Sequence, residues 1–141
     1  MKKILIINSN YYKNISNHLL INAKKKLFQK RIQISQIDVP GVFEIPFTIR
    51  KNIKKYDGFV ALGCVIKGQT PHFDLICSST FNAILQIVIN FNKPIGNGII
   101  TALNMKQAIS RSQKSTLKTP NKGSEAANAV LSVIINEPKK I

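Results

Sequence analysis

One segment near the middle of the chain combines an anion-binding turn with a side chain that can transfer protons. Residues 61–74, ALGCVIKGQTPHFD, have the pattern of a buried strand, a glycine-containing turn and the start of a helix. Thr70 is a favourable N-cap, and Pro71 suits the first helical position, where its missing N–H costs nothing. Unpaired N–H groups at such a turn bind phosphate or carboxylate, and the His72 imidazole follows directly. The segment therefore predicts an enzyme that acts on a small anionic substrate.

The elements that position this turn follow from the apolar spacing along the chain. Short apolar runs, which are typical of buried strands, alternate with segments whose apolar residues recur at helical spacing. Such alternation implies βαβ units with right-handed crossovers and a parallel sheet between helices, with ligands bound at the carboxyl ends of the strands. We expect strands at residues 3–8, 32–39, 59–64 and 95–101, and helices at residues 15–30, 43–55, 73–91, 104–112 and 123–136.

The length and the charge limit the classes of function. A chain of 141 residues favours a single domain, residues 1–141, with a core that needs no disulfide or metal. The net charge is +15, from 21 Lys and Arg against 6 Asp and Glu, which suggests nucleic acid as a partner. The lysines are, however, scattered along the sequence, arginine occurs only three times, and no basic and aromatic residues interleave. We therefore expect a solvated basic surface and no nucleic acid.

Neither a membrane segment nor a metal site is expected. The apolar run after Lys3 ends after four residues, which is too short for a signal peptide, and Gln86 and Asn90 interrupt the run at residues 83–91. Cys64 and Cys77 do not have the spacing of metal ligands, and we expect both to be reduced packing residues. A cytoplasmic protein follows by default.

Three segments together resemble the lumazine synthase family. Residues 39–46 (VPGVFEIP) are similar to its segment VPGAFEIP, and residues 61–74 resemble its segment LGxVIRGxTxHFD. Residues 121–127 (NKGSEAA) match its segment NKGxEAA. The three occur in the order and spacing of that family, and the resemblance extends over nearly the whole chain.

The resemblance implies a fold and an activity. It implies a flavodoxin-like three-layer α/β sandwich and a transferase of riboflavin biosynthesis. The expected reaction condenses 5-amino-6-(D-ribitylamino)uracil with 3,4-dihydroxy-2-butanone 4-phosphate to give 6,7-dimethyl-8-ribityllumazine and phosphate. It also implies that the enzyme uses no metal or organic cofactor, forms pentamers or shells of pentamers, and places its active sites between neighbouring subunits.

By this resemblance, the pyrimidine substrate contacts residues from three segments. Tyr11 occupies the position of an aromatic residue that stacks on the pyrimidine ring, and the adjacent Tyr12 is an alternative for that role. Glu44 supplies a carboxylate acceptor for the ribityl chain. An ordinary packing role remains open for each position. The other residues expected to bind the pyrimidine are Val42, Phe43, Cys64, Val65, Ile66 and Asn97, and Asn97 stands where the family has an aromatic or apolar residue.

The same resemblance assigns the phosphate and the proton transfers. His72 matches the histidine that transfers protons, and Arg111 matches an arginine whose guanidinium grips the phosphate. Lys122 matches a lysine near the same pocket. The turn that holds the phosphate contains Gly68, Gln69 and Thr70.

Particular features of the sequence bear on the assembly and on three alternative functions. The segment between Arg111 and Asn121 is longer than in shell-forming relatives, and the chain starts directly at its first strand. We therefore expect a free pentamer or a decamer. Asn97 and Tyr12 leave open a non-catalytic scaffold that binds lumazine or flavin. An enzyme similar to the archaeal type of riboflavin synthase is a weaker alternative, and so is a basic nucleic-acid binder.

Overall fold

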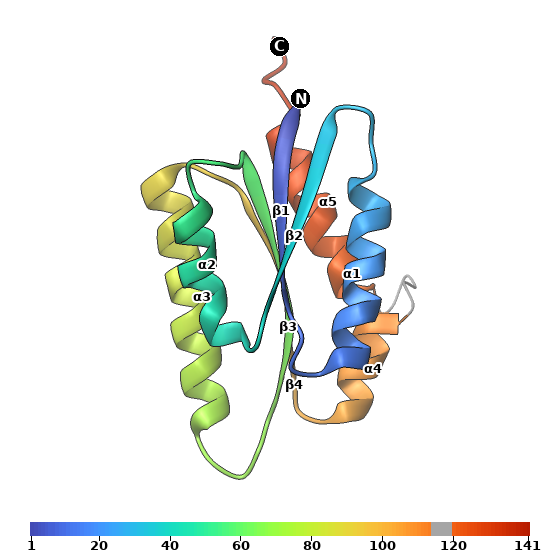
Figure 1. Cartoon of the computed structure of the whole chain (residues 1–141), viewed down its shortest axis with the longest axis vertical. Coiled ribbons are helices and arrows are strands. Elements are labelled where there is room, and N and C mark those ends of the chain that lie inside the picture. Colours follow the sequence, from blue (N-terminus) through green and yellow to red (C-terminus); the bar gives the residue numbers. More distant parts are fainter. Residues whose placement is uncertain (114–119) are drawn as a thin grey trace.

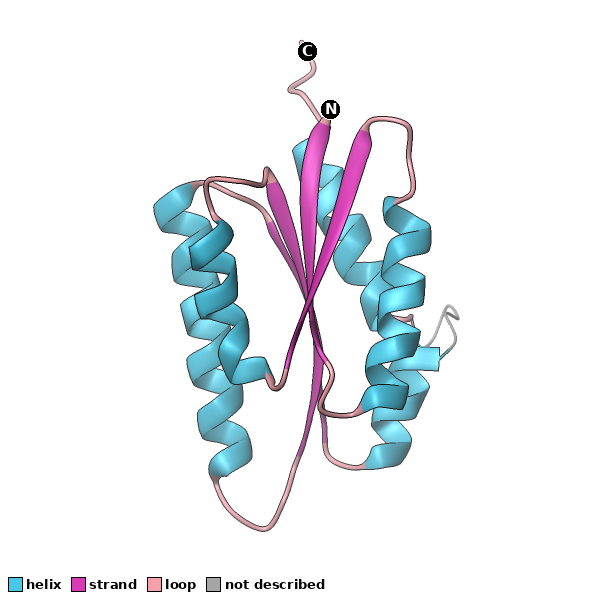
Figure 2. Cartoon of the chain, viewed as in Figure 1, coloured by secondary structure: helices cyan, strands magenta, loops and turns pink. Residues whose placement is uncertain are grey.

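A four-stranded parallel sheet forms the middle layer of the fold. The computed structural model describes residues 1–113 and 120–141. The strands lie in the order β2-β1-β3-β4 and are all parallel, which confirms the expected α/β class (Figures 1 and 2). The first two are β1 (Lys2–Ser9) and β2 (Ile32–Val39), and the other two are β3 (Gly58–Ile66) and β4 (Ile95–Ala102).

Helices cover both faces of the sheet and complete three layers (Figure 1). Each crossover between parallel strands has to traverse the sheet, so each helix runs back along it from the carboxyl edge to the amino edge. One face carries α1 (Lys13–Leu27), α4 (Met105–Gln113) and α5 (Lys122–Ile134). The other carries the 3-10 turn η1 (Val42–Glu44), α2 (Ile45–Asn52) and α3 (His72–Phe91).

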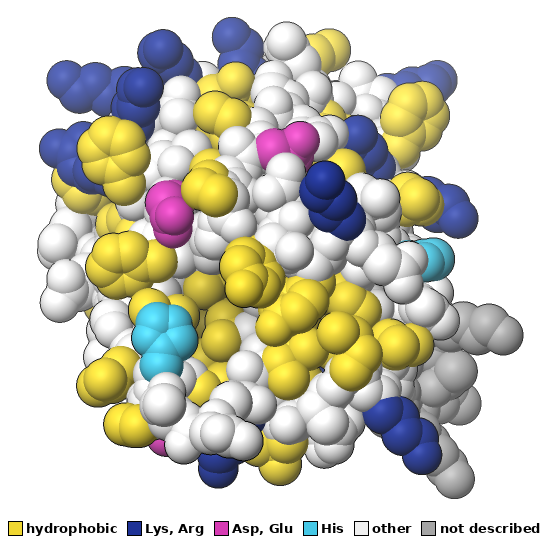
Figure 3. Space-filling model, turned by 60° about the horizontal axis from the view of Figure 1, so that its bottom comes forward, with side chains coloured by type: hydrophobic (Ala, Val, Ile, Leu, Met, Phe, Trp, Pro, Cys, Tyr) yellow, Lys and Arg dark blue, Asp and Glu magenta, His cyan; other side chains and the backbone are white. Residues whose placement is uncertain are grey.

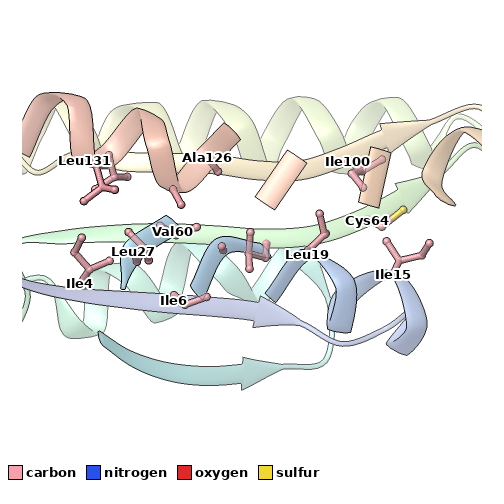
Figure 4. Close-up of a cluster of buried hydrophobic side chains, with 14 of the residues drawn as sticks. Ile4, Ile6, Ile15, Leu19, Leu27, Val60, Cys64, Ile100, Ala126 and Leu131 are labelled. Carbon is pink, nitrogen blue, oxygen red and sulfur yellow. The ribbon is translucent and has the colours of Figure 1, made fainter. Parts of the chain in front are cut away.

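The hydrophobic core consists of two clusters, one on each face of the sheet. Figure 4 shows the first cluster, in which Ile6 and Val60 of the sheet meet Leu19 of α1. The second packs Leu5 and Phe59 against the helices of the opposite face. Apolar side chains therefore point to both faces of the central strands, as expected of a parallel sheet buried on both sides.

All five expected helix starts differ from the observed ones by one or two residues, and the expected cap of α3 is wrong. The carbonyl of Pro71 accepts the first helical hydrogen bond of α3, from Leu75 N at 3.2 Å, so Pro71 and not Thr70 is the residue that precedes the helix. Thr70 Oγ1 still accepts a long hydrogen bond, 3.4 Å, from His72 N. The first helix begins at Lys13, two residues before the expected start, and the Ser16 hydroxyl donates a hydrogen bond to the carbonyl of Ser9.

The start of α5 is held by a buried asparagine. Asn121 Oδ1 accepts a hydrogen bond of 3.0 Å from Ser124 N, and Asn121 Nδ2 donates to the carbonyl of Ser112 at the end of α4. This residue therefore caps one helix while it holds the preceding one. Residues 114–119, on which the expectation of a long loop rests, lie outside the described residues.

Helix α3 leaves much of its apolar surface exposed. By length and composition alone it is long enough and apolar enough to cross a membrane, and 17% of its most apolar window is buried. Its Thr80, Ile84 and Ile87 side chains face the fold. Leu75, Leu85 and Ile89 are between 56% and 71% exposed.

Replacing Gly123 by alanine is expected to destabilise the fold by about 1–3 kcal/mol. A Cβ at this position would lie 2.3 Å from the carbonyl oxygen of Leu19, which is backbone of α1 and cannot move aside as a side chain could. Thermal unfolding monitored by circular dichroism measures the change. Gly68→Ala is the control, because nothing lies within 4 Å of its Cβ position. Equal melting temperatures for the two variants would contradict this account of the contact between α1 and α5.

Candidate active site

A cavity of about 520 Å³ opens at the carboxyl edge of the sheet. The segments that follow β1, β2 and β3 meet there, since the three strands are parallel neighbours and end at the same edge. Figure 3 shows this end of the molecule, where hydrophobic side chains surround the hollow and one histidine lies beside it. The lining residues are Tyr11, Tyr12, Pro40, Gly41, Val42, Phe43, Glu44, Cys64, Val65, Ile66, Gly68, Thr70, His72, Phe73 and Ile76.

One glycine lets the β2 loop approach the sheet closely enough to form the cavity wall. A Cβ at Gly63 would lie 2.7 Å from Val42 Cγ1 and 3.0 Å from Ser9 Cβ, closer than carbon atoms approach. The absence of a side chain there allows η1 to pack directly on β3. Phe43 and Glu44 are consequently held at the mouth of the cavity while Val42 is buried.

Aromatic and apolar surfaces form two sides of the cavity. Tyr11 is 73% exposed, and its ring meets the Tyr12 ring edge to face at 4.9 Å between centroids. The end of β3 supplies an apolar wall in which Cys64 is buried and Val65 and Ile66 are half-buried. An exposed ring and an apolar wall in one cavity can each pack against a face of a flat heterocycle.

Burial keeps the cavity thiol and one phenol in their neutral forms. Burial, with a smaller contribution from Cys77, raises the pKa of Cys64 to about 12, so this thiol is not a nucleophile near neutral pH. Burial also raises the pKa of Tyr12, with smaller contributions from Cys64 and Tyr11. His72 is exposed at the rim of the cavity.

The Glu44 carboxylate is available to a ligand. The backbone carbonyl of Glu44 accepts a hydrogen bond of 2.8 Å from Thr48 Oγ1, which holds the peptide in place. The side chain itself is exposed, and its oxygen lies 3.4 Å from the Cβ position of Gly41. Such a carboxylate can accept hydrogen bonds from hydroxyl groups.

A second, smaller cavity of about 250 Å³ lies farther along the sheet, at β4. It contains both cations that the sequence assigned to phosphate, Arg111 and Lys122, and the Lys122 ammonium lies 3.5 Å from the Glu125 carboxylate. The Asn97 side chain accepts a hydrogen bond of 3.1 Å from Ile99 N of its own strand. The remaining lining residues are Phe81, Ile99, Ile100, Thr101 and Pro120.

The residues expected to form one site therefore fall into two groups. Ten of them line the first cavity, namely Tyr11, Val42, Phe43, Glu44, Cys64, Val65, Ile66, Gly68, Thr70 and His72. Asn97, Arg111 and Lys122 line the second, and among residues 1–113 and 120–141 the two cavities share no lining residue. Gln69 lies in the exposed turn and lines neither.

Sequence reasoning missed several residues that line the two cavities. Phe73 and Ile76 face the first cavity from the first turn of α3, and their helical spacing beside His72 is the signal that would have found them. Glu125 follows Lys122 at a spacing of three on α5, where opposite charges pair. Within residues 1–113 and 120–141, no group of His, Cys, Asp and Glu side chains is arranged to hold a metal ion.

The fold is a three-layer α/β sandwich with a cavity of about 520 Å³ at the carboxyl edge of its parallel sheet. A sequence model of the family described as 6,7-dimethyl-8-ribityllumazine synthase matches residues 1–136. The chain belongs to this family.

Proteins with this family name are similar to this chain over most of its length and of their own. The one from Bartonella henselae is 40% identical over 135 residues, which cover 93% of this chain and 85% of that protein. The one from Campylobacter jejuni is 36% identical, with 94% and 87% covered, and that from Methylorubrum populi is 35% identical, with 94% and 80% covered. The resemblance seen in the three short motifs is therefore confirmed over the chain.

Cys64 is expected to resist alkylation in the folded protein. A thiol with a pKa of about 12 is ionised in only about one molecule in ten thousand at pH 8, and iodoacetamide reacts with the thiolate. A Cys77→Ser variant isolates the reaction, and mass spectrometry follows it with and without denaturant. Equal rates in the folded and unfolded chain would contradict the burial of this thiol.

Proposed function

We propose that this chain is a 6,7-dimethyl-8-ribityllumazine synthase that acts in riboflavin biosynthesis in the cytoplasm. It condenses 5-amino-6-(D-ribitylamino)uracil with 3,4-dihydroxy-2-butanone 4-phosphate. The products are 6,7-dimethyl-8-ribityllumazine, phosphate and two waters. Family membership supports the reaction. The observation that carries the assignment of the site is the convergence of His72, the Gly68–Thr70 turn and an apolar wall on one cavity.

The pyrimidine binds in the first cavity in this proposal. The Tyr11 ring and the wall of Val65 and Ile66 sandwich the heterocycle, and Glu44 accepts hydrogen bonds from the ribityl hydroxyls. The main contribution of the protein is to hold two reactants in the geometry of attack.

The chemistry then follows from the groups that surround the bound pair. The 5-amino group of the pyrimidine attacks the ketone, and water leaves as the imine forms. Phosphate leaves by elimination, and the ribityl-bearing nitrogen closes the second ring with loss of a second water. His72 moves the protons that these steps require, because its imidazole lies at the rim of the cavity.

We place the phosphate site between two subunits. In one chain, Arg111 and Lys122 line a cavity separate from that of His72. A neighbouring copy that turned its second cavity toward the first cavity of this chain would bring the two groups together. The guanidinium would then bind the phosphate bidentately beside the Gly68–Thr70 turn.

The exposed apolar surface of α3 supports such an assembly. Leu75, Leu85 and Ile89 are large apolar side chains in water in the single chain, and contiguous exposed apolar surface marks protein contacts. We propose a closed ring of five subunits that does not build a shell. A heterologous (head-to-tail) contact that repeats around a ring gives each subunit one neighbour on either side. One site then forms at each contact.

His72→Ala is expected to lower kcat by about 10²- to 10⁴-fold with a folded protein, because a general acid–base group is lost. Lumazine fluorescence after mixing the two substrates measures the rate. His18→Ala, at the other histidine of the chain, is the matched control and keeps the rate, since His18 lies on α1 outside both cavities. An unchanged kcat in His72→Ala would remove the assigned role. A wild-type protein that binds the product without making any would show a scaffold instead of an enzyme.

Arg111→Ala is expected to raise the KM of the phosphate substrate by about 10- to 100-fold, because charge-assisted hydrogen bonds to the phosphate are lost. The KM of the pyrimidine substrate changes little. Steady-state kinetics with each substrate varied in turn separates the two effects. Equal increases for both substrates would argue against a contact specific to phosphate.

Mixing the His72→Ala and Arg111→Ala variants is expected to restore activity at limiting phosphate substrate if each site uses two subunits. A complete site then forms where an Arg111→Ala subunit supplies His72 and a His72→Ala subunit supplies Arg111. Random assembly of equal amounts after unfolding and refolding gives about one quarter of the wild-type activity. Activity that stays at the level of the separate variants would place the whole site within one chain.

A further inference from the structure

The positive charge of the chain is concentrated at one end of the molecule, which the sequence alone does not reveal. Fourteen of the 21 Lys and Arg lie at the amino edge of the sheet, where strands begin and helices end. We call this region the basic end. It consists of Lys2, Lys3, Lys24, Lys25, Lys26, Lys30, Arg31, Arg50, Lys51, Lys54, Lys55, Lys93, Lys139 and Lys140. Its acidic residues are Asp57 and Glu137.

The two candidate cavities that hold the proposed site are at the opposite end. Figure 3 brings that end forward, and most dark blue side chains lie toward the upper rim of the view. Four of the six acidic residues, Asp38, Glu44, Asp74 and Glu125, belong to elements near that end. A field centred on the basic end draws anions away from the cavities, so the capture of substrate does not account for it.

Local structure accounts for only part of the basic end. Five of its cations, including Lys26 and Arg50, lie in the last turns of α1 and α2, where they complement the helix dipoles. The other nine lie outside helices. In the part of the chain that the structure describes, the one salt bridge joins Lys122 to Glu125 at the other end, so no ion pair neutralises these cations.

Large apolar side chains are exposed among the same cations. Phe28 is 86% exposed and lies between Lys26 and Lys30 in the sequence, and Met1 is 82% exposed beside Lys2. Ile141 follows Lys140 and is fully exposed. Twelve of the fourteen cations are lysines, which act as point charges, whereas nucleic-acid recognition favours arginine.

We propose that the basic end docks on an anionic bilayer surface. The lysines attract the phosphates of the head groups, and Phe28 and Met1 enter the interface, which accepts apolar side chains beside charges. This attachment is peripheral and leaves the cavities at the opposite end open to the cytoplasm. It goes beyond the proposed reaction and does not depend on it.

Flotation with lipid vesicles tests the proposal on the full chain. Vesicles of phosphatidylcholine with about one third phosphatidylglycerol are compared with phosphatidylcholine alone, at about 0.1 M NaCl and at higher salt. We expect binding to the anionic vesicles only, and release by salt. Absence of binding, or equal binding to neutral vesicles, overturns the proposal. Binding to single-stranded RNA without any binding to vesicles also overturns it.

Matched charge reversals locate the contact. The double variant Lys54→Glu with Lys55→Glu is expected to weaken vesicle partition at least about tenfold. The double variant Lys13→Glu with Lys106→Glu changes the net charge equally at the opposite end and is expected to retain binding. Phe28→Asn weakens partition without changing the charge. Equal loss in the two double variants overturns the proposal, since net charge alone then decides binding. Lumazine formation in solution is measured separately and remains unchanged in Lys54→Glu with Lys55→Glu.

Discussion

Parallel pairing of β1 with β2 and β3 is the constraint on which both ends of the molecule depend. Parallel neighbours cannot be joined by a tight turn, so every connection must cross the sheet as a helix and return to the starting edge. Each strand of this chain therefore ends at the same edge, where the segments after β1, β2 and β3 meet around one cavity. The opposite edge collects the strand starts and the ends of α1, α2 and α3, and with them the basic side chains that follow those helices.

Two close contacts, one between η1 and β3 and one between α5 and α1, position the residues that line the cavities. Gly63 lets Val42 pack on β3, and Gly123 lets α5 touch the backbone of α1 near Leu19. The first contact positions the β2 loop beside the proposed pyrimidine site. The second supports the α5 start at Lys122, which belongs to the other cavity. The two cavities thus rest on different packing contacts within one fold.

Much of the fold and of the first cavity could be predicted from the sequence, because the relevant signals are local. The strand at Phe59 and the turn before His72 show in the apolar period and in the glycine and proline positions. The sequence predicts an N-cap at Thr70 because threonine is the better capping residue, but the carbonyl of Pro71 accepts the first helical hydrogen bond. The separation of Arg111 from His72 was beyond such reasoning, since it depends on how β4 and α4 lie relative to β3.

The lysines show the converse case, in which the fold brings together residues that the sequence keeps apart. Lys2, Lys54 and Lys93 are far apart in the sequence, which predicts a scattered charge, yet the parallel topology gathers them at one edge. In a fold with right-handed crossovers, the crossover helices end at the same edge of the sheet. Lysines in the segments that follow these helices therefore lie together at one end of the molecule. The two candidate cavities and the concentrated positive charge consequently occupy opposite ends of the sheet. A partner can bind the charged end while the cavities at the other end remain free for small molecules and for a neighbouring subunit.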